Sequence, residues 1–306
     1  MAEDVILVTG ATGTQGGATI DALLAGGFRA RALVRDLGSP AAQELDRRGV
    51  TLFKGDFDDD ASVAGAVRGA SGVFSMQTTP RPDDLDYELR TGERLIAAAR
   101  AAEVKTFVHT SVARAGDQES FVDWASGRWS PNYWNSKSGV NEAVRSAGFS
   151  RWVILKPAFM MDNFIPPKAG WMFPGLARGT VETALRAETR LDLIAAADVG
   201  RFAAAAFEEP ARFDRQEIDL AAEALTMAEV AATLAAVTGR PVEARSLSGA
   251  QARAAGNSPG LVESQQWANV EGYRVDIARA NAHGIQLQRF RRWAEEHRDR
   301  FEIGGA

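Results

Sequence analysis

Short apolar runs alternate with longer segments of helical period through the first half of the chain. The runs are mostly rich in Val, Leu, Ile or Phe and are often bounded by Gly, Asp or Ser. This pattern predicts six strands, at residues 5–9, 30–34, 50–54, 72–75, 106–111 and 151–156. Strands that alternate with crossover helices form a parallel sheet flanked by helices, so we predict one doubly wound α/β domain.

Two of the intervening segments illustrate the helical period. Ile20, Leu23 and Leu24 fall on one face of a helix over 18–24. The segment 85–102 shows the same kind of spacing, with apolar side chains at Leu89, Leu95, Ile96 and Ala99. Each helix therefore has an apolar face that can pack on the sheet.

The alternation ends after Pro157. Residues 159–179 hold many aromatic and methionine side chains together with three prolines, a composition that suits a loop-rich lid or pocket wall. We therefore predict a second, smaller α/β domain in the C-terminal half. The predicted boundaries are 1–157 with a returning segment at about 190–222 for the first domain, and 158–189 with 223–306 for the second.

Further elements are expected beyond residue 190. A helix at 198–207 precedes a strand at 217–220. Thr226 and Glu229 have the spacing of a capping box, which predicts the start of a helix there. The chain is expected to close with an amphipathic helix, whose apolar face comprises Leu287, Phe290, Ala294, His297 and Phe301.

The composition excludes several kinds of site. The 306 residues include no cysteine, so disulfides, thiolate metal sites and cysteine nucleophiles are ruled out. The three histidines, His109, His283 and His297, are scattered without ligand spacing, and we predict no metal site. The formal net charge is −5 and the two signs of charge are interleaved, so we predict no direct nucleic-acid binding.

The apolar segments also bear on location. The N-terminal sequence MAEDVILVTG lacks a basic region followed by a long apolar stretch, so we expect no signal peptide. The longest apolar stretches elsewhere, such as 202–207, are too short for a membrane span. We therefore expect no membrane association and a cytoplasmic location.

A glycine-rich turn directly follows the first predicted strand. Gly10, Gly13 and Gly16 have the spacing G-x-x-G-x-x-G, and a helix is predicted after them. Gly10 permits a tight turn, Gly13 lets the backbone approach a diphosphate, and Gly16 allows the helix to pack closely. The helix start then offers free N–H groups and a positive dipole end to the phosphates. This context predicts a Rossmann-type dinucleotide site rather than a glycine turn without a ligand.

Charged residues at the ends of the next two strands bear on which dinucleotide binds. Arg35 precedes Asp36 at the end of the second strand, and an arginine there can pair with the 2′-phosphate of NADP(H). We therefore predict a preference for NADP(H), with NAD(H) possible; the alternative is that Arg35 and Asp36 pair only with each other or with solvent. After the third strand, Asp56 could accept a hydrogen bond from the adenine amine, or cap the following helix, or both.

A tyrosine and a lysine follow the fifth strand at helical spacing. Tyr133 and Lys137 are four residues apart, so their side chains lie on one face of a helix predicted to run to residue 147. A nearby ammonium and an oxidised nicotinamide would lower the phenol pKa from roughly 10. Tyr133 would then exchange a proton with a substrate carbonyl, and Ser111, or its neighbour Thr110, would hydrogen-bond it. The alternative is that Lys137 binds only the nicotinamide ribose and Tyr133 is merely packed.

Several segments together resemble one protein family: GATGTQGG, LVRD, KGDFDD, HTSV, NSKSGVNEAVRSAG, LKPAFMMDNF and AADVGRFAAAAFEEP. To about residue 245 the chain is similar to the NmrA-like group of atypical short-chain dehydrogenases. The resemblance implies an extended short-chain dehydrogenase fold with a small C-terminal substrate domain, and NADP(H) binding through Gly10, Gly13, Gly16 and Arg35. Lys137 matches the lysine that this group shares with the wider superfamily.

Two functions follow from this resemblance. Many NmrA-like members lack a tyrosine four residues before that lysine and are thought to sense the redox state of the cofactor through partner proteins. Here Tyr133 stands where catalytic short-chain dehydrogenases have it. This favours an NADPH-dependent oxidoreductase for a small hydrophobic carbonyl or quinone. The alternative is a non-catalytic NADP(H) sensor that binds a regulatory protein partner.

The predicted sites comprise three sets of residues. The catalytic set is Tyr133, Lys137 and Ser111. Phe159, Phe164 and Trp171 are expected to contact a hydrophobic substrate, although such clusters also form the core between two domains. The predicted cofactor contacts are Gly10, Thr12, Gly13, Thr14, Gln15, Gly16, Arg35, Asp56, Lys137 and Pro157.

Overall fold

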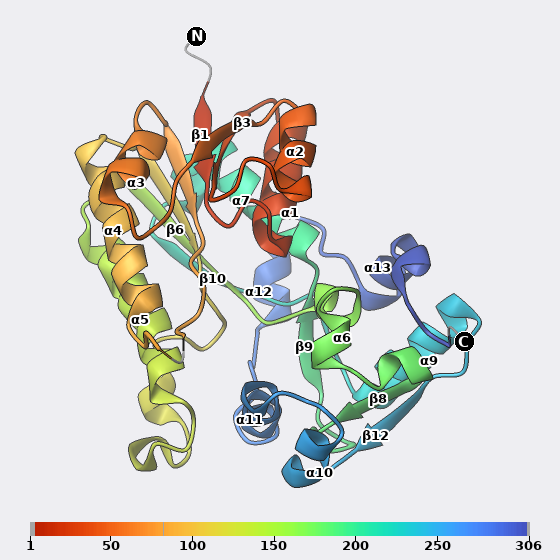
Figure 1. Cartoon of the computed structure of the whole chain (residues 1–306). Coiled ribbons are helices and arrows are strands. Elements are labelled where there is room, and N and C mark those ends of the chain that lie inside the picture. Colours follow the sequence, from red (N-terminus) through yellow and green to blue (C-terminus); the bar gives the residue numbers. More distant parts are fainter. Residues whose placement is uncertain (1–3, 82, 305–306) are drawn as a thin grey trace. The chain divides into compact units, whose positions relative to one another are not determined.

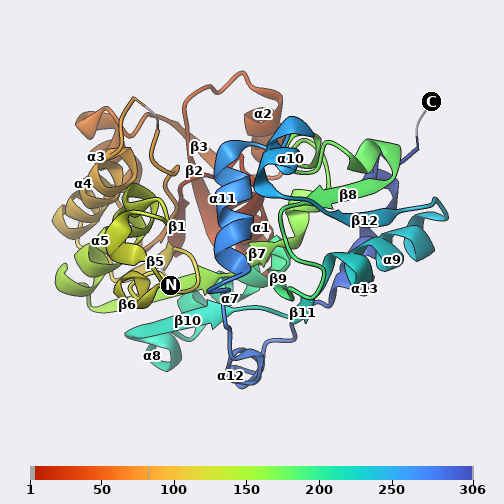
Figure 2. The same ribbon diagram turned by 90° about the horizontal axis from the view of Figure 1, so that it is seen from below.

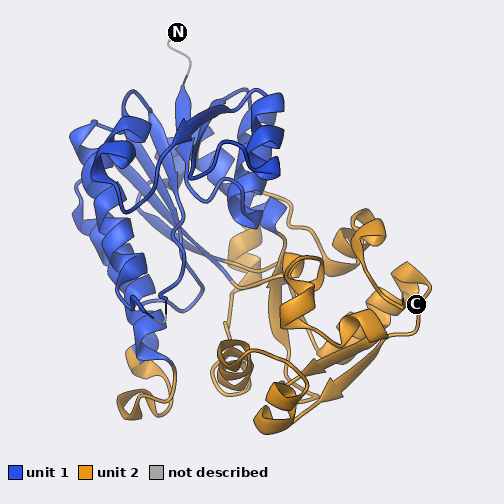
Figure 3. Cartoon of the chain, in the orientation of Figure 1, with its two compact units in different colours: residues 1–118, 130–157, 196–219 blue, residues 119–129, 158–195, 220–306 orange. Residues whose placement is uncertain are grey.

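The structure of the chain, a computed structural model, describes residues 4–81 and 83–304. It divides into two compact units, shown in Figure 3. The first comprises residues 1–118, 130–157 and 196–219, and the second comprises 119–129, 158–195 and 220–306. The first predicted domain included 119–129, which lie in the second unit.

A seven-stranded sheet forms the centre of the first unit (Figure 1). Its strands are β1 (Val5–Val8), β2 (Arg29–Val34), β3 (Thr51–Lys54), β4 (Gly72–Ser75), β5 (Thr106–Thr110), β6 (Arg151–Pro157) and β10 (Gln216–Leu220). The order across the sheet is β10-β6-β5-β4-β1-β2-β3, and the pairings from β3 to β6 are all parallel. The predicted doubly wound α/β fold is therefore confirmed.

Helices cover both faces of this sheet. They are α1 (Thr14–Ala25), α2 (Pro40–Arg47), α3 (Asp60–Val67), α4 (Tyr87–Ala101), α5 (Pro131–Ser146), α7 (Ala196–Glu208) and α8 (Pro210–Phe213). Figures 1 and 2 show α3, α4 and α5 side by side on one face, with α1, α2 and α7 on the other. Helices α1 and α7 approach closely, because a Cβ on Gly200 would lie 2.4 Å from the Ala18 carbonyl oxygen.

The order of the strands indicates where a ligand would bind. Successive strands run outward in one direction from β1 through β2 to β3, and in the other direction from β4 to β6. Ligands of open α/β sheets bind at such a switch point, beyond the carboxyl ends of the strands. The ends of β1 and β4 are joined there, because Thr9 Oγ1 donates to the Met76 carbonyl at 2.9 Å and accepts from its N–H at 2.8 Å.

The second unit is built from smaller pieces. Strands β7 (Phe159–Met160), β9 (Leu191–Ile194) and β11 (Glu223–Leu225) form one sheet, and β8 (Thr180–Thr183) pairs with β12 (Glu243–Ser246). Its helices are α6 (Ala169–Met172), α9 (Met227–Thr238), α10 (Gly249–Ala254), α11 (Pro259–Ala268), α12 (Ile277–Asn281) and α13 (Phe290–Glu296). The capping box before α9 is confirmed, since the Thr226 and Glu229 side chains each bind the other residue's backbone N–H.

The closing helix is shorter than its apolar spacing predicted. Helix α13 covers only Phe290–Glu296, and a short 3-10 turn follows at Arg298–Arg300. Leu287 precedes the helix and Phe301 follows the turn, so the predicted single helix over all five apolar positions is wrong. The helix ends at His297, whose backbone leaves the helical region with φ −108° and ψ 15°.

Candidate functional site

The glycine turn has the backbone geometry of a phosphate-binding loop. Gly10 has φ 63°, in the region that favours glycine, and the Gly13 N–H donates to the Gly10 carbonyl at 2.9 Å. Helix α1 begins at Thr14, and no side chain caps its first turn. Backbone N–H groups at an uncapped helix start form a ready anion site.

The turn leaves little room for a Cβ atom at its glycines. On Gly16 it would lie 2.2 Å from the Gly10 carbonyl oxygen, which no real contact allows. On Gly13, an exposed residue, it would lie 3.2 Å from the same oxygen. The turn therefore has an open cradle next to an uncapped helix start, and these residues fit a bound diphosphate. Gly16 instead lets the start of α1 pack closely against the backbone of Gly10.

Other predicted cofactor residues meet at the same edge of the sheet. Gln15 Oε1 accepts a hydrogen bond of 2.7 Å from Thr110 Oγ1, which ties the start of α1 to the end of β5. Thr12 is exposed and Thr14 is partly exposed. Pro157 ends β6, where its carbonyl accepts from the Ala113 N–H at 3.1 Å.

The charged residues after β2 and β3 are arranged differently from the prediction. Arg35 is exposed and has no salt bridge among the residues that the structure describes, while Asp36 accepts from the Gly38 N–H at 2.8 Å. The proposed Arg35–Asp36 pair therefore does not form. Asp56 does not cap the next helix; it accepts from the Asp58 N–H, and Asp59 is the N-cap of α3.

Tyr133 and Lys137 lie on one helix, as predicted. Helix α5 begins at Pro131, directly after Ser130, which has φ 39°. The Tyr133 ring is partly exposed, packs edge-on against Trp134, and has its centroid 5.8 Å from Lys137 Nζ. The ammonium thus faces the aromatic ring.

A buried glutamate is the main feature that the sequence analysis missed. Glu88, on α4, places its Oε1 2.5 Å from Lys137 Nζ, and its Oε2 accepts from Ser136 Oγ at 2.6 Å. The Lys137 side chain is 11% exposed and that of Glu88 only 2%. A signal was present: Glu88 lies seven residues before Leu95, on the apolar face of the predicted helix.

The surroundings of Tyr133 raise the pKa of its phenol. Burial, and then the negative charge of Glu88, raise the pKa of Tyr133 above its ordinary value of 10.0. The predicted lowering involves the ammonium together with an oxidised nicotinamide, and it stays a prediction. Without that cofactor, burial disfavours the phenolate most and the Glu88 carboxylate disfavours it next.

The remaining predicted catalytic residue, Ser111, lies at the end of β5. Its Oγ is buried and has no hydrogen-bond partner among the described residues. Nearby in the chain, His109 is also buried, with Nδ1 3.2 Å from Ser75 Oγ and Nε2 unpartnered within the described part of the chain. Buried polar atoms without partners are rare and mark places where water or a ligand group can bind.

His109 gives the protein a pH-dependent stability. Burial, and then the charge of Lys137, lower the pKa of His109 to about 3. The unfolded chain binds this proton near pH 6.5 and the folded chain only near pH 3, so stability falls as the pH falls through that window. Between about pH 7 and pH 4.5 we expect His109 to cost the folded state about 2–3 kcal/mol. Urea unfolding at both pH values should show a smaller acid loss for His109→Gln; an equal loss in both proteins would contradict this.

The predicted substrate residues belong to the second unit. Phe164 is fully buried, stacks on Phe173 with centroids 4.5 Å apart, and also contacts Phe290, so it is part of that unit's core. Trp171, on α6, is 53% exposed. Phe159 borders a small, mostly apolar hollow whose other lining residues are Phe173, Leu185, Leu191, Met227, Ser264, Gln265 and Ala268.

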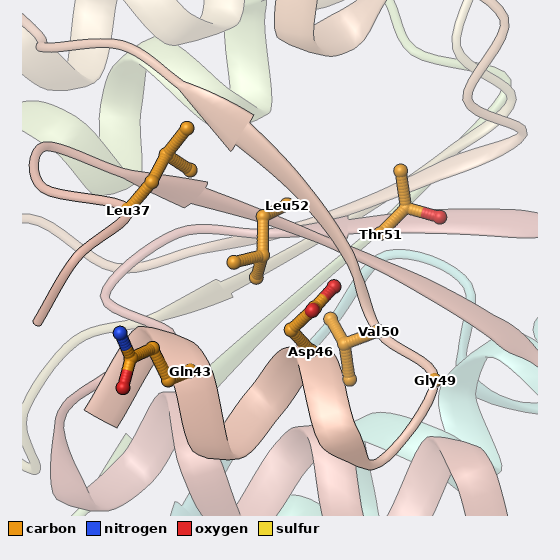
Figure 4. A pocket seen from close by; sticks show the side chains of 7 residues that line it. All are labelled: Leu37, Gln43, Asp46, Gly49, Val50, Thr51 and Leu52. Carbon is orange, nitrogen blue, oxygen red and sulfur yellow. The ribbon is translucent and has the colours of Figure 1, made fainter. Parts of the chain in front are cut away.

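A larger hollow, of about 590 Å³, lies along the edge strand β3 (Figure 4). It is lined by Leu37, Gln43, Asp46, Gly49, Val50, Thr51 and Leu52. None of the predicted cofactor or catalytic residues lines it. It is a shallow surface feature between α2 and β3, and the phosphate cradle lies elsewhere.

Two further findings concern metals and membranes. Within residues 4–81 and 83–304, no group of three or more His, Asp or Glu side chains is placed to hold a metal ion. In the same part of the chain, no helix is long and apolar enough to cross a membrane.

Comparison with known proteins identifies the family. The model of the NmrA-like family matches residues 2–285. An NAD(P)H azoreductase from Xenophilus azovorans is 31% identical over 263 residues, which cover 85% of this chain and 83% of the azoreductase.

Solved structures share the fold over nearly the full length. An NADPH-dependent quinone oxidoreductase from Escherichia coli, QOR2, solved with NADPH, has a TM-score of 0.76 at 21% identity, covering 96% of this chain and 99% of that one. The negative transcriptional regulator NmrA, solved with NADP, also has a TM-score of 0.76, at 20% identity over 97% of this chain and 95% of that one. The chain therefore belongs to the NmrA-like family, which confirms the resemblance of its motifs.

Proposed function

We propose that the protein uses NADPH to reduce a small hydrophobic substrate that carries a carbonyl or quinone group. The observation that carries the proposal is Tyr133 four residues before Lys137 on α5, in the same compact unit as the open glycine cradle. A proton donor and a dinucleotide site in one unit meet the requirements of hydride-transfer reduction.

The residues of this chain would bind the cofactor at three places. The N–H groups at the start of α1 hold the diphosphate, because the exposed Gly13 leaves the cradle open. The exposed Arg35 guanidinium pairs with the 2′-phosphate. Lys137 holds the nicotinamide ribose. When bound, the reduced nicotinamide supplies the hydride.

Tyr133 then acts as the proton donor. Its hydroxyl gives a proton to the substrate oxygen as the neighbouring carbon accepts the hydride, so a carbonyl becomes an alcohol. Because the pKa of Tyr133 is raised, the phenol stays protonated through the physiological range and holds the proton to be donated. Ser111 can assist only if its buried Oγ turns toward the substrate.

The names of similar proteins support the substrate class. The similar proteins are named as reductases of azo compounds and quinones. The test is NADPH oxidation with a panel of quinones, azo dyes and aromatic ketones. Turnover of a quinone or ketone supports the proposal, and no turnover across the panel contradicts it.

Arg35 should decide between the two forms of the cofactor. A charge-assisted pair with the 2′-phosphate contributes about 1.5–3 kcal/mol. We therefore expect Arg35→Ala to weaken NADPH binding about 10- to 100-fold, with little change for NADH. Titration of the protein with both nucleotides by calorimetry measures this, and Arg47→Ala, an exposed arginine on α2, is the control. Equal losses for the two nucleotides would contradict the assignment.

A second candidate function is a cofactor sensor that acts through a protein partner. It is supported by the likeness in fold to NmrA, which is named as a negative transcriptional regulator. A sensor must bind NADP⁺ and NADPH with different affinities, since only differential binding shifts an equilibrium. A large difference in the two Kd values, together with no turnover in the panel, would favour this function.

A further inference from the structure

A buried ion pair links α4 to α5 beneath the proposed proton donor. The Glu88 carboxylate touches Lys137 Nζ with one oxygen at 2.5 Å and accepts from Ser136 Oγ with the other at 2.6 Å. Both charged side chains are almost fully buried. Removing either partner of such a pair leaves an uncompensated buried charge.

Two charged groups lie near the Tyr133 side chain, Glu88 from α4 and Lys137 from α5 itself. A third titratable group, His109 from β5, lies near Lys137. His109 is neutral above its pKa of about 3, so it contributes no charge at working pH. The negative charge of Glu88 therefore stands against the positive charge of Lys137, and no net positive charge remains to favour a phenolate.

We propose that Glu88 is a positioning residue which holds and neutralises the Lys137 ammonium, so that Tyr133 serves as a proton donor. This inference rests on the proposed function. The proton that Tyr133 gives to the substrate oxygen is replaced from solvent after each turnover. Reduction should therefore show no alkaline decline caused by loss of the Tyr133 proton.

Glu88→Gln tests this role with an uncharged side chain of the same shape. The freed ammonium should lower the midpoint of the Tyr133 phenol titration by about 1–3 pH units, the usual effect of an unopposed neighbouring charge. Ultraviolet difference spectra of the cofactor-free protein, each variant minus its Tyr133→Phe version, measure that midpoint. Glu93→Gln is the matched control, because Glu93 is exposed on the same helix.

Activity gives a second readout. The pH profile of reduction should gain an alkaline decline in Glu88→Gln, while Glu93→Gln keeps the wild-type profile. A phenol midpoint in Glu88→Gln equal to the wild-type midpoint would overturn the inference. Because the phenol titration needs neither cofactor nor substrate, it can succeed or fail whether or not the protein reduces any compound in the panel.

A second pair of variants keeps the test decisive if Glu88→Gln does not fold. Lys137→Met alone leaves the Glu88 carboxylate unopposed and should raise the Tyr133 midpoint. Adding Glu88→Gln to Lys137→Met removes both charges and should bring the midpoint down again. If the double variant and Lys137→Met had the same midpoint, Glu88 would have no influence on the phenol and the inference would be wrong.

Discussion

Tyr133→Phe is expected to lower kcat for reduction by about 10²- to 10⁴-fold, the usual contribution of one positioned proton donor. The change removes a single oxygen and leaves the ring, so the edge-on packing against Trp134 is kept. The Lys137–Glu88 ion pair involves neither the ring nor its hydroxyl, and it should also be kept. Affinity for NADPH should therefore stay close to that of the wild-type protein.

Two measurements separate this loss from general damage. Steady-state NADPH oxidation gives kcat, and a fluorescence titration gives the Kd for NADPH. Tyr273→Phe makes the same chemical change in the second unit, where Tyr273 packs edge-on against Trp267, and should have little effect on kcat. If Tyr133→Phe turned over at the wild-type rate, Tyr133 would not be the proton donor.

The fold could be predicted because local patterns determine most of it. Each of the six strands predicted in the first half agrees with the structure to within one residue at either end. Buried parallel strands read as short apolar runs, and the glycine turn gives the connection from β1 to α1. The prediction of the closing helix was wrong because the spacing of apolar residues does not show where a helix stops. In the structure the helix ends at His297, before the last predicted apolar position, Phe301.

The arrangement of the site residues could be predicted only for residues that are close together in the sequence. Tyr133 and Lys137 share a helix, so their relation follows from helical geometry. Glu88 reaches Lys137 from another helix, 49 residues earlier in the chain, and no local spacing gives that contact. The Glu88 carboxylate adds to the effect of burial, which is the larger cause of the raised phenol pKa. One signal was present in the local sequence. Glu88 is a charged residue at a position of α4 where the helical spacing predicts a buried apolar side chain.

The aromatic segment after residue 157 shows a different limit. Composition predicts that such residues gather, but it does not separate a core from a pocket wall. Phe164 lies in the core of the second unit, Trp171 is exposed, and Phe159 lines a small hollow. All three were predicted to contact substrate, yet their environments differ. The reason is that burial depends on packing against segments distant in sequence, such as α13, which contributes Phe290 next to Phe164.

Gly16→Ala is expected to abolish most dinucleotide binding. The added methyl would lie 2.2 Å from the carbonyl oxygen of Gly10 and 2.5 Å from its carbon, both backbone atoms, so the turn itself must move. Overpacking of this kind costs about 1–3 kcal/mol of folding free energy. Displacing the cradle should also raise the Kd for NADPH by about 100-fold or more, which corresponds to roughly 2.8 kcal/mol.

Gly17→Ala is the matched control, because it adds the same methyl one residue later. There it would lie 3.7 Å from the nearest atom, the Ala11 carbonyl oxygen, which is ordinary contact. Alanine inside a helix is more favourable than glycine by about 1 kcal/mol, so this variant should unfold at higher urea and still bind NADPH. If Gly16→Ala bound NADPH as tightly as Gly17→Ala, the turn after β1 would not be the diphosphate site, and the cofactor would have to bind elsewhere on the first unit.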